Sequence, residues 1–213
     1  MNCWTNRALN NSNRHGHLTV IYGPMFSSKT DNLLILLSVG MGIGKKILII
    51  NNIIDERPGL ESSGILTSHR DSPCRIKQAQ QISVNRLEEV PKKEIDENDV
   101  IGIDEAQFFE DITLVFEWLK MGKTIITAGL MFTSESKPFG DYYMLLSHAD
   151  KVIKLNAVCL PCMSELSKHG INLTIPAIMT KYLGSKKGDV LVGSEGYIPV
   201  CRFHYYQEEN NSE

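Results

Sequence analysis

Hydrophobic and polar positions follow two patterns along most of the chain. Short runs rich in Val, Ile and Leu predict buried strands, and apolar residues at helical spacing between them predict helices. The predicted strands cover residues 18–22, 45–51, 99–104, 123–130 and 151–155. The predicted helices cover residues 30–40 and 108–120, with shorter ones at 84–90 and 142–147. This alternation is typical of an α/β fold with an open, mainly parallel sheet flanked by helices, whose ligands bind at the carboxyl ends of the strands.

Two parts of the chain depart from this pattern. Residues 52–83 are polar with little periodicity, which predicts a long excursion from the sheet, and such loops are often functional. From residue 156 onward the chain has short β-prone pieces and many turns. The expected units are a flexible tail at 1–16, an α/β domain at 17–154, a smaller module at 155–207 and a second tail at 208–213.

The first predicted strand runs directly into a phosphate-loop pattern. The reference pattern is Gly, four residues, Gly, Lys and Ser or Thr, and Ser28 stands in place of its second glycine. In such a loop backbone N–H groups wrap a triphosphate, the lysine supplies positive charge and the threonine hydroxyl binds magnesium. The candidate phosphate-binding residues are Gly23, Pro24, Met25, Phe26, Ser27, Ser28, Lys29 and Thr30. An ordinary strand–turn–helix is the alternative for this stretch alone.

The third predicted strand ends in two carboxylates, Asp104 and Glu105. A phosphate-loop enzyme uses one acid to hold magnesium or its waters and another to take a proton from the attacking hydroxyl. A solvated strand end is the alternative, and the preceding phosphate loop favours the catalytic interpretation. We therefore predict that magnesium binds near Thr30 and Asp104.

Four soft metal ligands lie in the smaller module. Cys159 and Cys162 form a CLPC knuckle, and Cys201 and His204 follow in CRFH. Two such pairs are typical of a tetrahedral structural zinc site with no open position. A redox dithiol and buried free cysteines are the alternatives, but a redox pair does not explain the second pair.

Composition narrows the class of protein. Lys and Arg number 22 against 25 acidic residues, giving a net charge of -3, which argues against a protein that coats nucleic acid. The longest apolar stretch, 33–43, is too short to span a membrane, and the first seventeen residues lack the apolar centre of a signal peptide. We therefore expect a cytoplasmic protein without nucleic-acid or membrane partners.

Taken together, these pieces resemble the thymidine kinases of the cytosolic, zinc-containing type. The matching segments are GPMFSSKT at 23–30, IDEAQFF at 103–109, KPFG at 137–140, CLPC at 159–162 and GYIPVCRFHY at 196–205. The resemblance implies a phosphate-loop α/β domain with a zinc-ribbon or lasso domain. It also implies transfer of the γ-phosphoryl group of ATP, with magnesium, to the 5′-hydroxyl of thymidine or deoxyuridine in nucleotide salvage.

The resemblance also implies roles for individual residues. Glu105 is the expected general base, while Asp104 and Gln107 are expected to contact ATP. A lasso between the two metal pairs is expected to close over the nucleoside largely through backbone groups. The candidate thymidine-binding residues are Met25, Phe108, Phe139, Thr180, Gly188, Asp189, Val190, Leu191, Val192, Gly193 and Tyr197. Residues 55–57 match an Asp-x-Arg element of the family's phosphate region, and a homotetramer inhibited by thymidine triphosphate is expected.

The chain departs from the family in several places. Besides Ser28, Met131 and Ser134 occupy positions where the family has an aspartate and an aromatic ring that packs on the thymine. Phe132 is a candidate to replace that ring in part, and Arg70 stands where the family has an acid. Residues 163–176 enlarge the lasso. The departures make a catalytically weakened nucleotide-binding protein, acting as a regulator or assembly partner, the alternative function. An ATPase acting on a macromolecule is a third hypothesis, which the acidic balance and the lack of a basic run argue against.

Overall fold

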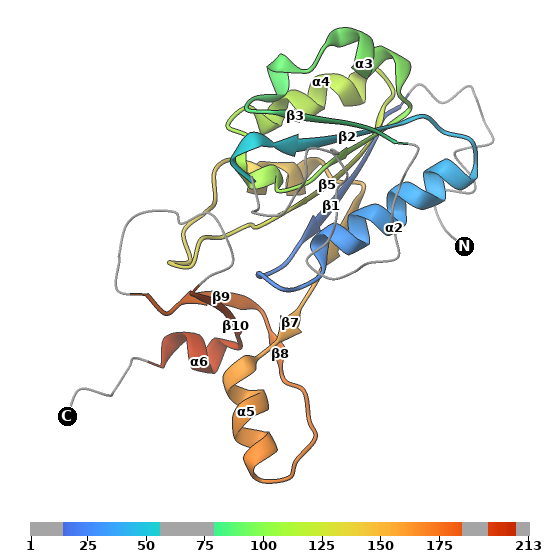
Figure 1. The fold of residues 1–213 in the computed structure, drawn as a ribbon. Helices are drawn as coiled ribbons and strands as arrows, with labels where there is room; N and C mark the ends of the chain where they lie inside the picture. Colours follow the sequence, from blue (N-terminus) through green and yellow to red (C-terminus); the bar gives the residue numbers. More distant parts are fainter. Residues whose placement is uncertain (1–14, 56–78, 185–195, 208–213) are drawn as a thin grey trace.

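A six-stranded parallel sheet forms the centre of the molecule (Figure 1). The computed structural model describes residues 15–55, 79–184 and 196–207. The strands are β1 (His17–Tyr22), β2 (Ile47–Asn52), β3 (Gln80–Val84), β4 (Val100–Ile103), β5 (Thr124–Gly129) and β6 (Lys151–Lys154). Their order is β3-β2-β4-β5-β1-β6, and every pairing is parallel. The predicted α/β class with an open parallel sheet flanked by helices is confirmed.

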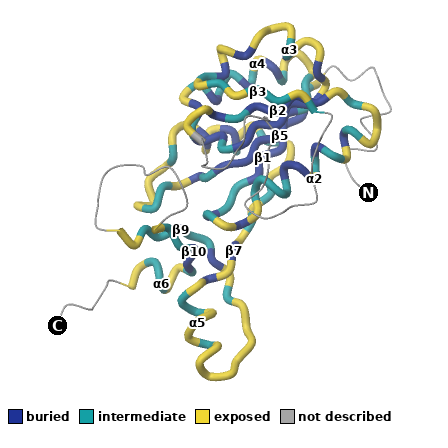
Figure 2. Tube along the Cα trace, viewed as in Figure 1, coloured by how far each residue is buried: buried dark blue, intermediate teal, exposed yellow. Residues whose placement is uncertain are grey.

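Each face of the sheet carries its own hydrophobic core (Figure 2). Because side chains alternate along a strand, Val20 lies in one core and the next residue, Ile21, lies in the other. Helix α2 (Lys29–Gly42) covers the second face through buried leucines such as Leu37. A Cβ atom at Gly102 would lie 2.6 Å from the Leu37 Cδ1 atom, so a larger residue there would force the Leu37 side chain to shift.

Short helical segments cover the other face. They are η2 (Leu87–Glu89), α3 (Lys92–Glu97), η3 (Ala106–Phe108), η4 (Ile112–Leu114), α4 (Val115–Lys120) and η5 (Tyr142–His148), while η1 (Ile53–Asp55) follows β2. The single helix predicted at 108–120 is wrong in its extent: only 115–120 is α-helical, because the carboxylate of Asp111 accepts hydrogen bonds from the N–H groups of Leu87 and Glu88 and holds the chain in turns. The helix predicted at 84–90 is a strand end and a 3-10 turn, and that at 142–147 is a 3-10 helix.

The C-terminal part folds below the carboxyl ends of the strands (Figure 1). Here β7 (Ala157–Val158) pairs with β8 (Pro176–Ala177), and β9 (Met179–Tyr182) pairs with β10 (Tyr197–Val200), both antiparallel. Helices α5 (Leu160–Lys168) and α6 (Arg202–Tyr206) each begin directly after the first ligand of a metal-ligand pair and contain the second. We call residues 157–182 and 197–206 the metal module. Its small core contains Ala157, Cys159, Ala177 and Val200, separate from the two cores of the sheet.

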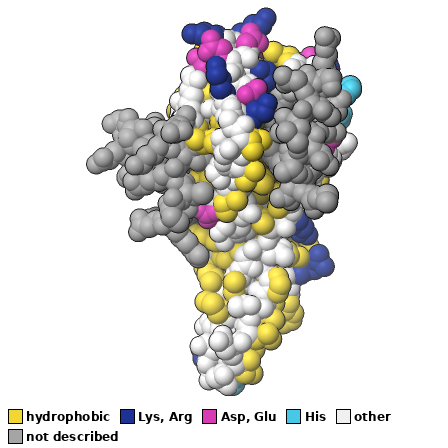
Figure 3. Space-filling view, turned by 90° about the vertical axis from the view of Figure 1, so that its right-hand side faces the viewer, with side chains coloured by type: hydrophobic (Ala, Val, Ile, Leu, Met, Phe, Trp, Pro, Cys, Tyr) yellow, Lys and Arg dark blue, Asp and Glu magenta, His cyan; other side chains and the backbone are white. Residues whose placement is uncertain are grey.

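Helix α5 replaces the turns expected after the first knuckle. Pro161 suits the first turn of a helix, where its missing N–H has no partner to lose. No residue of α5 is buried, and Met163, Ile171 and Leu173 are exposed on the projecting segment. In the space-filling view hydrophobic side chains lie along this narrow end, while charged ones gather at the opposite end of the molecule (Figure 3). Among the described helices, none has the length and apolar character needed to cross a bilayer.

Candidate active site and metal centre

The predicted phosphate loop lies between β1 and α2, in the expected order of strand, loop and helix. A Cβ atom at Gly23 would lie 2.6 Å from both the Leu155 carbonyl oxygen and the Ser27 Oγ atom, so only glycine fits there. Ser27 Oγ and Lys29 Nζ donate to the Pro24 carbonyl at 2.8 and 2.9 Å, respectively. These hydrogen bonds curl the loop around the position at which a phosphate-loop protein binds its anion.

Ser28 adopts the left-handed backbone conformation, with φ of 58°. L-residues other than glycine pay about 1 kcal/mol or more for that conformation. Glycine is usual at this position of the reference pattern for two reasons. It adopts the left-handed conformation without strain, and it has no side chain to block the approach of a phosphate. Phe26 also has positive φ, at 63°, which gives the loop two strained non-glycine residues.

We expect Ser28→Gly to raise the melting temperature by a few degrees, because glycine adopts this conformation without the roughly 1 kcal/mol cost. The Michaelis constant for ATP should stay the same or fall. Thermal unfolding and steady-state kinetics with varied ATP measure both effects. A clear rise in the Michaelis constant for ATP would show that the Ser28 side chain itself contributes to nucleotide binding.

The two candidate magnesium groups are in direct contact. The Thr30 hydroxyl donates to the Asp104 carboxylate, with Oγ1 and Oδ2 separated by 2.9 Å. Asp104 is only 4% exposed at the end of β4, so its charge acts in a partly desolvated setting. A hydroxyl and a carboxylate oxygen are hard ligands of the type that Mg²⁺ prefers. The residues therefore fit the ion that kinases require.

Glu105 is held by its backbone and by one neighbouring amide. It is a non-glycine residue with φ of 46°, at the start of η3, and such strain is often found at functional sites. Gln107 Nε2 donates to Glu105 Oε2 at 2.7 Å, and Gln107 Oε1 accepts from the Leu130 N–H at 2.9 Å. A Cβ atom at Gly129 would lie 2.7 Å from Gln107 Oε1. The Gln107 amide thus joins the candidate base to the segment after β5.

A buried tyrosine, Tyr142, feels the charges of the two carboxylates. The Tyr142 hydroxyl donates to the Ile21 carbonyl at 2.9 Å and shares a hydrogen bond with Thr127 Oγ1 at 3.1 Å. Burial raises the pKa of Tyr142 well above its usual value, and the charges of Asp104 and Glu105 raise it further. Burial therefore keeps the Tyr142 hydroxyl protonated, and its two hydrogen bonds hold it between β1 and β5.

Several candidate nucleoside residues also come together. The rings of Phe108 and Phe139 meet edge to face, with centroids 5.4 Å apart. The Met25 N–H donates to Thr180 Oγ1 at 3.0 Å, so β9 of the metal module touches the phosphate loop. Tyr197 lies further into the module, with its ring 4.9 Å from that of Tyr182. The predicted contacts at 188–193 lie outside the described residues.

The positions that depart from the family have separate environments. Met131 is 4% exposed and belongs to the core between the sheet and the short helices. Phe132 is 55% exposed, so its ring is accessible at the surface near Phe139. Ser134 uses its backbone carbonyl, which accepts a hydrogen bond from the Tyr205 hydroxyl.

The four predicted metal ligands converge in the metal module. Their candidate ligand atoms all lie within 4.8 Å of one another. The Sγ atom of Cys162 is 3.8 Å from that of Cys201, and His204 Nδ1 is 3.3, 3.4 and 3.6 Å from the sulfur atoms of Cys162, Cys201 and Cys159. With Zn–S and Zn–N bonds of about 2.3 and 2.0 Å, the edges of a tetrahedron are roughly 3.8 Å for S–S and 3.5 Å for S–N. The ligand set therefore fits tetrahedral zinc.

Electrostatics also favours a cation at this point. Burial and the adjacent thiols of Cys159 and Cys201 raise the pKa of Cys162 to about 12. Burial also opposes ionisation of Cys201, but hydrogen bonds from His204 and the other thiols lower its pKa to about 6. Thiols packed this closely cannot all ionise without a compensating charge, which a divalent cation supplies.

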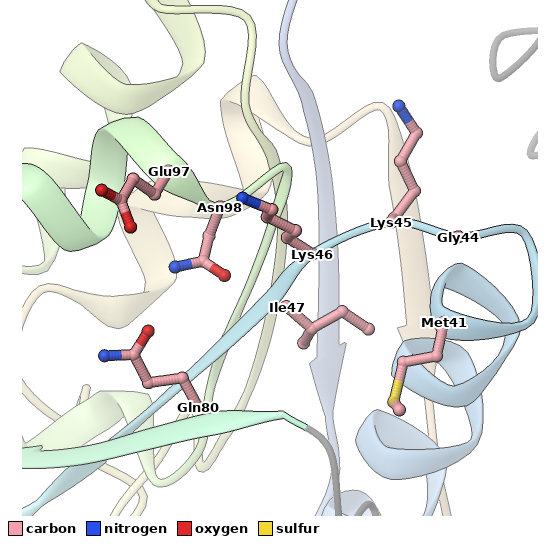
Figure 4. Close-up of a pocket in the computed structure, with 8 residues that line it drawn as sticks. All are labelled: Met41, Gly44, Lys45, Lys46, Ile47, Gln80, Glu97 and Asn98. Atoms are coloured by element: carbon pink, nitrogen blue, oxygen red, sulfur yellow. The ribbon is translucent and has the colours of Figure 1, made fainter.

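A separate hollow lies at the amino end of the sheet, away from all of the predicted site residues (Figure 4). Its volume is about 430 Å³, and Asn98 lies between Glu97 and Lys46 on its polar wall. Ligands of open α/β sheets bind at the carboxyl ends of the strands. The phosphate loop and the carboxylates, which lie at those ends, are therefore the stronger candidate site.

Comparison with known proteins decides the family. The family model for thymidine kinase matches residues 16–205. The chain belongs to the thymidine kinase family. It is 34% identical to thymidine kinase 1 of Dictyostelium discoideum over 202 residues, which cover 92% of this chain and 80% of that protein. It is also 34% identical to the thymidine kinase of Yaba monkey tumor virus over 93% of this chain and 99% of that protein. Its identity to the cytosolic thymidine kinase of Homo sapiens is 34%, covering 92% and 76% of the two chains.

Some features of this thymidine kinase family site were not found from sequence. The hydrogen bond from the Met25 N–H to Thr180 Oγ1 joins residues 155 positions apart. Tyr142, whose hydroxyl donates to the Ile21 carbonyl, belongs to no recognised motif. The Asn52 side chain, buried at the end of β2, donates to the Asn85 and Phe108 carbonyls. Met25 and Gln107 do have local signals, because they belong to the GPMFSSKT segment at 23–30 and the IDEAQFF segment at 103–109.

Proposed function

We propose that this member of the thymidine kinase family transfers the γ-phosphoryl group of ATP to the 5′-hydroxyl of thymidine or deoxyuridine. The observation that carries the proposal is the arrangement of Thr30, Asp104 and Glu105 beside the phosphate loop. Thr30 and Asp104 would hold magnesium, and the ion would neutralise negative charge on the phosphates during transfer. The loop N–H groups and Lys29 hold the triphosphate.

Glu105 acts as the general base. Its carboxylate accepts the proton of the 5′-hydroxyl, the hydroxyl oxygen forms the new bond to the γ-phosphorus, and the bond to the β-phosphate oxygen breaks to release ADP. The strained backbone and the Gln107 amide hold the carboxylate in one orientation, so little reorganisation accompanies proton transfer. We assign Gln107 to positioning, because both ends of its amide are already engaged, one with the Glu105 carboxylate and the other with the Leu130 N–H.

Gln107→Leu should lower kcat by about tenfold to a hundredfold, the range expected when a catalytic group loses its fixed orientation. The Michaelis constant for ATP should change little. Steady-state kinetics with both substrates varied separates the two parameters. A large rise in the Michaelis constant for ATP with unchanged kcat would instead support the phosphate-binding role that the family resemblance implied.

Nucleoside binding is assigned to the space bordered by Phe108, Phe139 and Met25, with Thr180 and Tyr197 contributed by the metal module. The edge-to-face pair of phenylalanine rings supplies an apolar wall for a pyrimidine. Residues 188–193 are proposed to close over the base and sugar through backbone groups. A site that hydrogen-bonds particular donors and acceptors rejects a base that leaves them unpaired.

The ion of the metal module is proposed to be structural zinc. The four side chains would fill all the positions of a tetrahedral ion, so none would be open for substrate. The module has a core of a few small residues, too little to order it by hydrophobic burial alone. Zinc ligation therefore supplies much of its stability.

We also propose a cytoplasmic homotetramer that thymidine triphosphate inhibits. Helix α2 and its C-cap expose an apolar stripe at Ile35, Val39 and Ile43, spaced four residues apart, and the edge strand β6 exposes Val152. Stripes of this kind mark contact surfaces. Light scattering of the purified protein tests the assembly, and a mass of a monomer at micromolar concentration would contradict it.

The direct test uses purified, zinc-loaded protein with thymidine, ATP and magnesium. We expect formation of thymidine monophosphate and ADP in equal amounts. A folded, zinc-containing protein that binds ATP and forms no product would favour the alternative, a nucleotide-binding regulator of the same fold.

A further inference from the structure

The segment after β5 forms a tight hairpin at residues 131–139. Its two arms are joined at the root by a hydrogen bond from the Phe139 N–H to the Met131 carbonyl at 2.9 Å, and a single antiparallel bridge follows. At the tip the Thr133 N–H donates to the Lys137 carbonyl at 2.8 Å. These local bonds give the hairpin its shape, but they do not fix its direction relative to the sheet.

Long-range hydrogen bonds fix that direction at both ends. At the root, Gln107 Oε1 accepts from the Leu130 N–H at 2.9 Å. At the tip, the Tyr205 hydroxyl donates to the Ser134 carbonyl at 2.7 Å and accepts from Ser136 Oγ at 2.9 Å. The phenol thus uses both its donor and an acceptor position on one hairpin. Tyr205 lies in α6, which is drawn beside β10 in Figure 1.

The tip is held by polar contacts and not by apolar packing. Glu135, Ser136 and Lys137 are exposed and polar, so no apolar anchor packs the tip against the protein. Ser136 has φ of 59°, a strained conformation that surrounding contacts must maintain. Tyr205 is half-buried and directly follows the metal ligand His204. Its hydroxyl is therefore placed by the metal centre.

We infer that Tyr205 is a positioning residue for nucleoside binding, which ties the hairpin at 131–139 to the metal centre. The hairpin ends at Phe139, whose ring forms the edge-to-face pair with Phe108. A fixed hairpin keeps that pair assembled before the nucleoside binds, so less ordering accompanies binding. The inference rests on the proposed function, because it assigns the pyrimidine to the Phe108–Phe139 wall.

The metal module contacts the two halves of the site through different residues. Thr180 meets the phosphate loop at the Met25 N–H, whereas Tyr205 meets the hairpin. Loss of the Tyr205 hydroxyl should therefore affect nucleoside binding and leave ATP binding intact. Nucleoside and ATP Michaelis constants measured on one variant separate these two contacts.

The test compares Tyr205→Phe with Tyr206→Phe in the full-length, zinc-loaded protein. Tyr206 is the adjacent residue of the same helix and is 67% exposed, which makes it a matched control. We expect Tyr205→Phe to raise the Michaelis constant for thymidine roughly threefold to tenfold, as expected for one or two lost hydrogen bonds of ordinary strength. The Michaelis constant for ATP, zinc content and kcat should stay within twofold, and Tyr206→Phe should resemble wild type.

A second variant tests the bond itself. Ser136→Ala removes one of the two bonds, so its effect should be smaller and should not add to that of Tyr205→Phe in the double variant. An unchanged thymidine constant in Tyr205→Phe, or fully additive effects, would overturn the inference.

Amide hydrogen exchange measures the opening of the hairpin and does not depend on catalytic turnover. The amides of residues 131–139 should exchange faster in Tyr205→Phe than in wild type or Tyr206→Phe, because the hairpin opens more often. Unchanged exchange would overturn the inference even in an active enzyme. If the wild-type protein did not phosphorylate thymidine, the proposed function would be contradicted. The exchange rates of the hairpin amides would still decide whether Tyr205 holds the hairpin.

Discussion

Glu105→Gln should reduce kcat for thymidine phosphorylation by about a hundredfold to ten-thousandfold, the usual contribution of a general base. The glutamine side chain keeps the size of the glutamate and can still contact the Gln107 amide, but it cannot accept the proton of the 5′-hydroxyl. The Michaelis constants for thymidine and ATP should change little, because the variant removes an interaction that acts in the transition state.

Glu110→Gln is the matched control for this prediction. Glu110 lies five residues further along, with its side chain 86% exposed, and pairs with Arg86 at the surface. Its loss should leave kcat unchanged. If Glu105→Gln retained activity within tenfold of wild type, another group or water would have to accept the proton.

Cys159→Ser should remove the bound zinc and with it the order of the metal module. Cys159 is fully buried, and serine replaces a thiolate with a hydroxyl that binds zinc poorly. Because metal binding and folding are coupled in such modules, we expect the metal module to lose on the order of 3 kcal/mol of stability or more. Thymidine binding should fall by at least tenfold through lost support of Thr180 and Tyr205, while ATP binding through the phosphate loop should persist in part.

Zinc content per chain, thermal unfolding and calorimetric titration with each substrate measure these effects. His169→Ala is the control, because His169 is an exposed residue of the same module outside the metal cluster. A Cys159→Ser protein that retained stoichiometric zinc, with unchanged unfolding and thymidine binding, would contradict a structural role for the cluster.

The buried strands could be predicted because each is covered on both faces and therefore reads as a continuous apolar run. This holds for β2, β4 and β5, whose residues are mostly fully buried. Strand β3, with sequence QQISV, lies at the edge of the sheet and is partly exposed, so its pattern is polar and was assigned to a loop. In β3 the edge position leaves too few apolar residues for the strand to be predicted, whereas the other edge strand, β6, keeps the apolar pair Val152 and Ile153.

The site was predictable where residues act in local motifs. The metal ligands have diagnostic spacing, and the structure brings all four together. The sequence shows that Ser28 departs from the phosphate-loop pattern. The positive φ of Ser28 can be seen only in the folded backbone. The contacts of Tyr205 with Ser134 and Ser136 join residues 71 and 69 positions apart, and no local pattern encodes such pairs.

The measurement that tests this account most directly is a nucleoside panel assayed for phosphorylation by the purified, zinc-loaded protein with ATP and magnesium. We predict that thymidine and deoxyuridine are phosphorylated at the 5′-hydroxyl and that purine deoxynucleosides are not. Absence of product from every pyrimidine nucleoside, in protein shown to be folded and to contain zinc, would contradict the assignment of this chain as an active kinase.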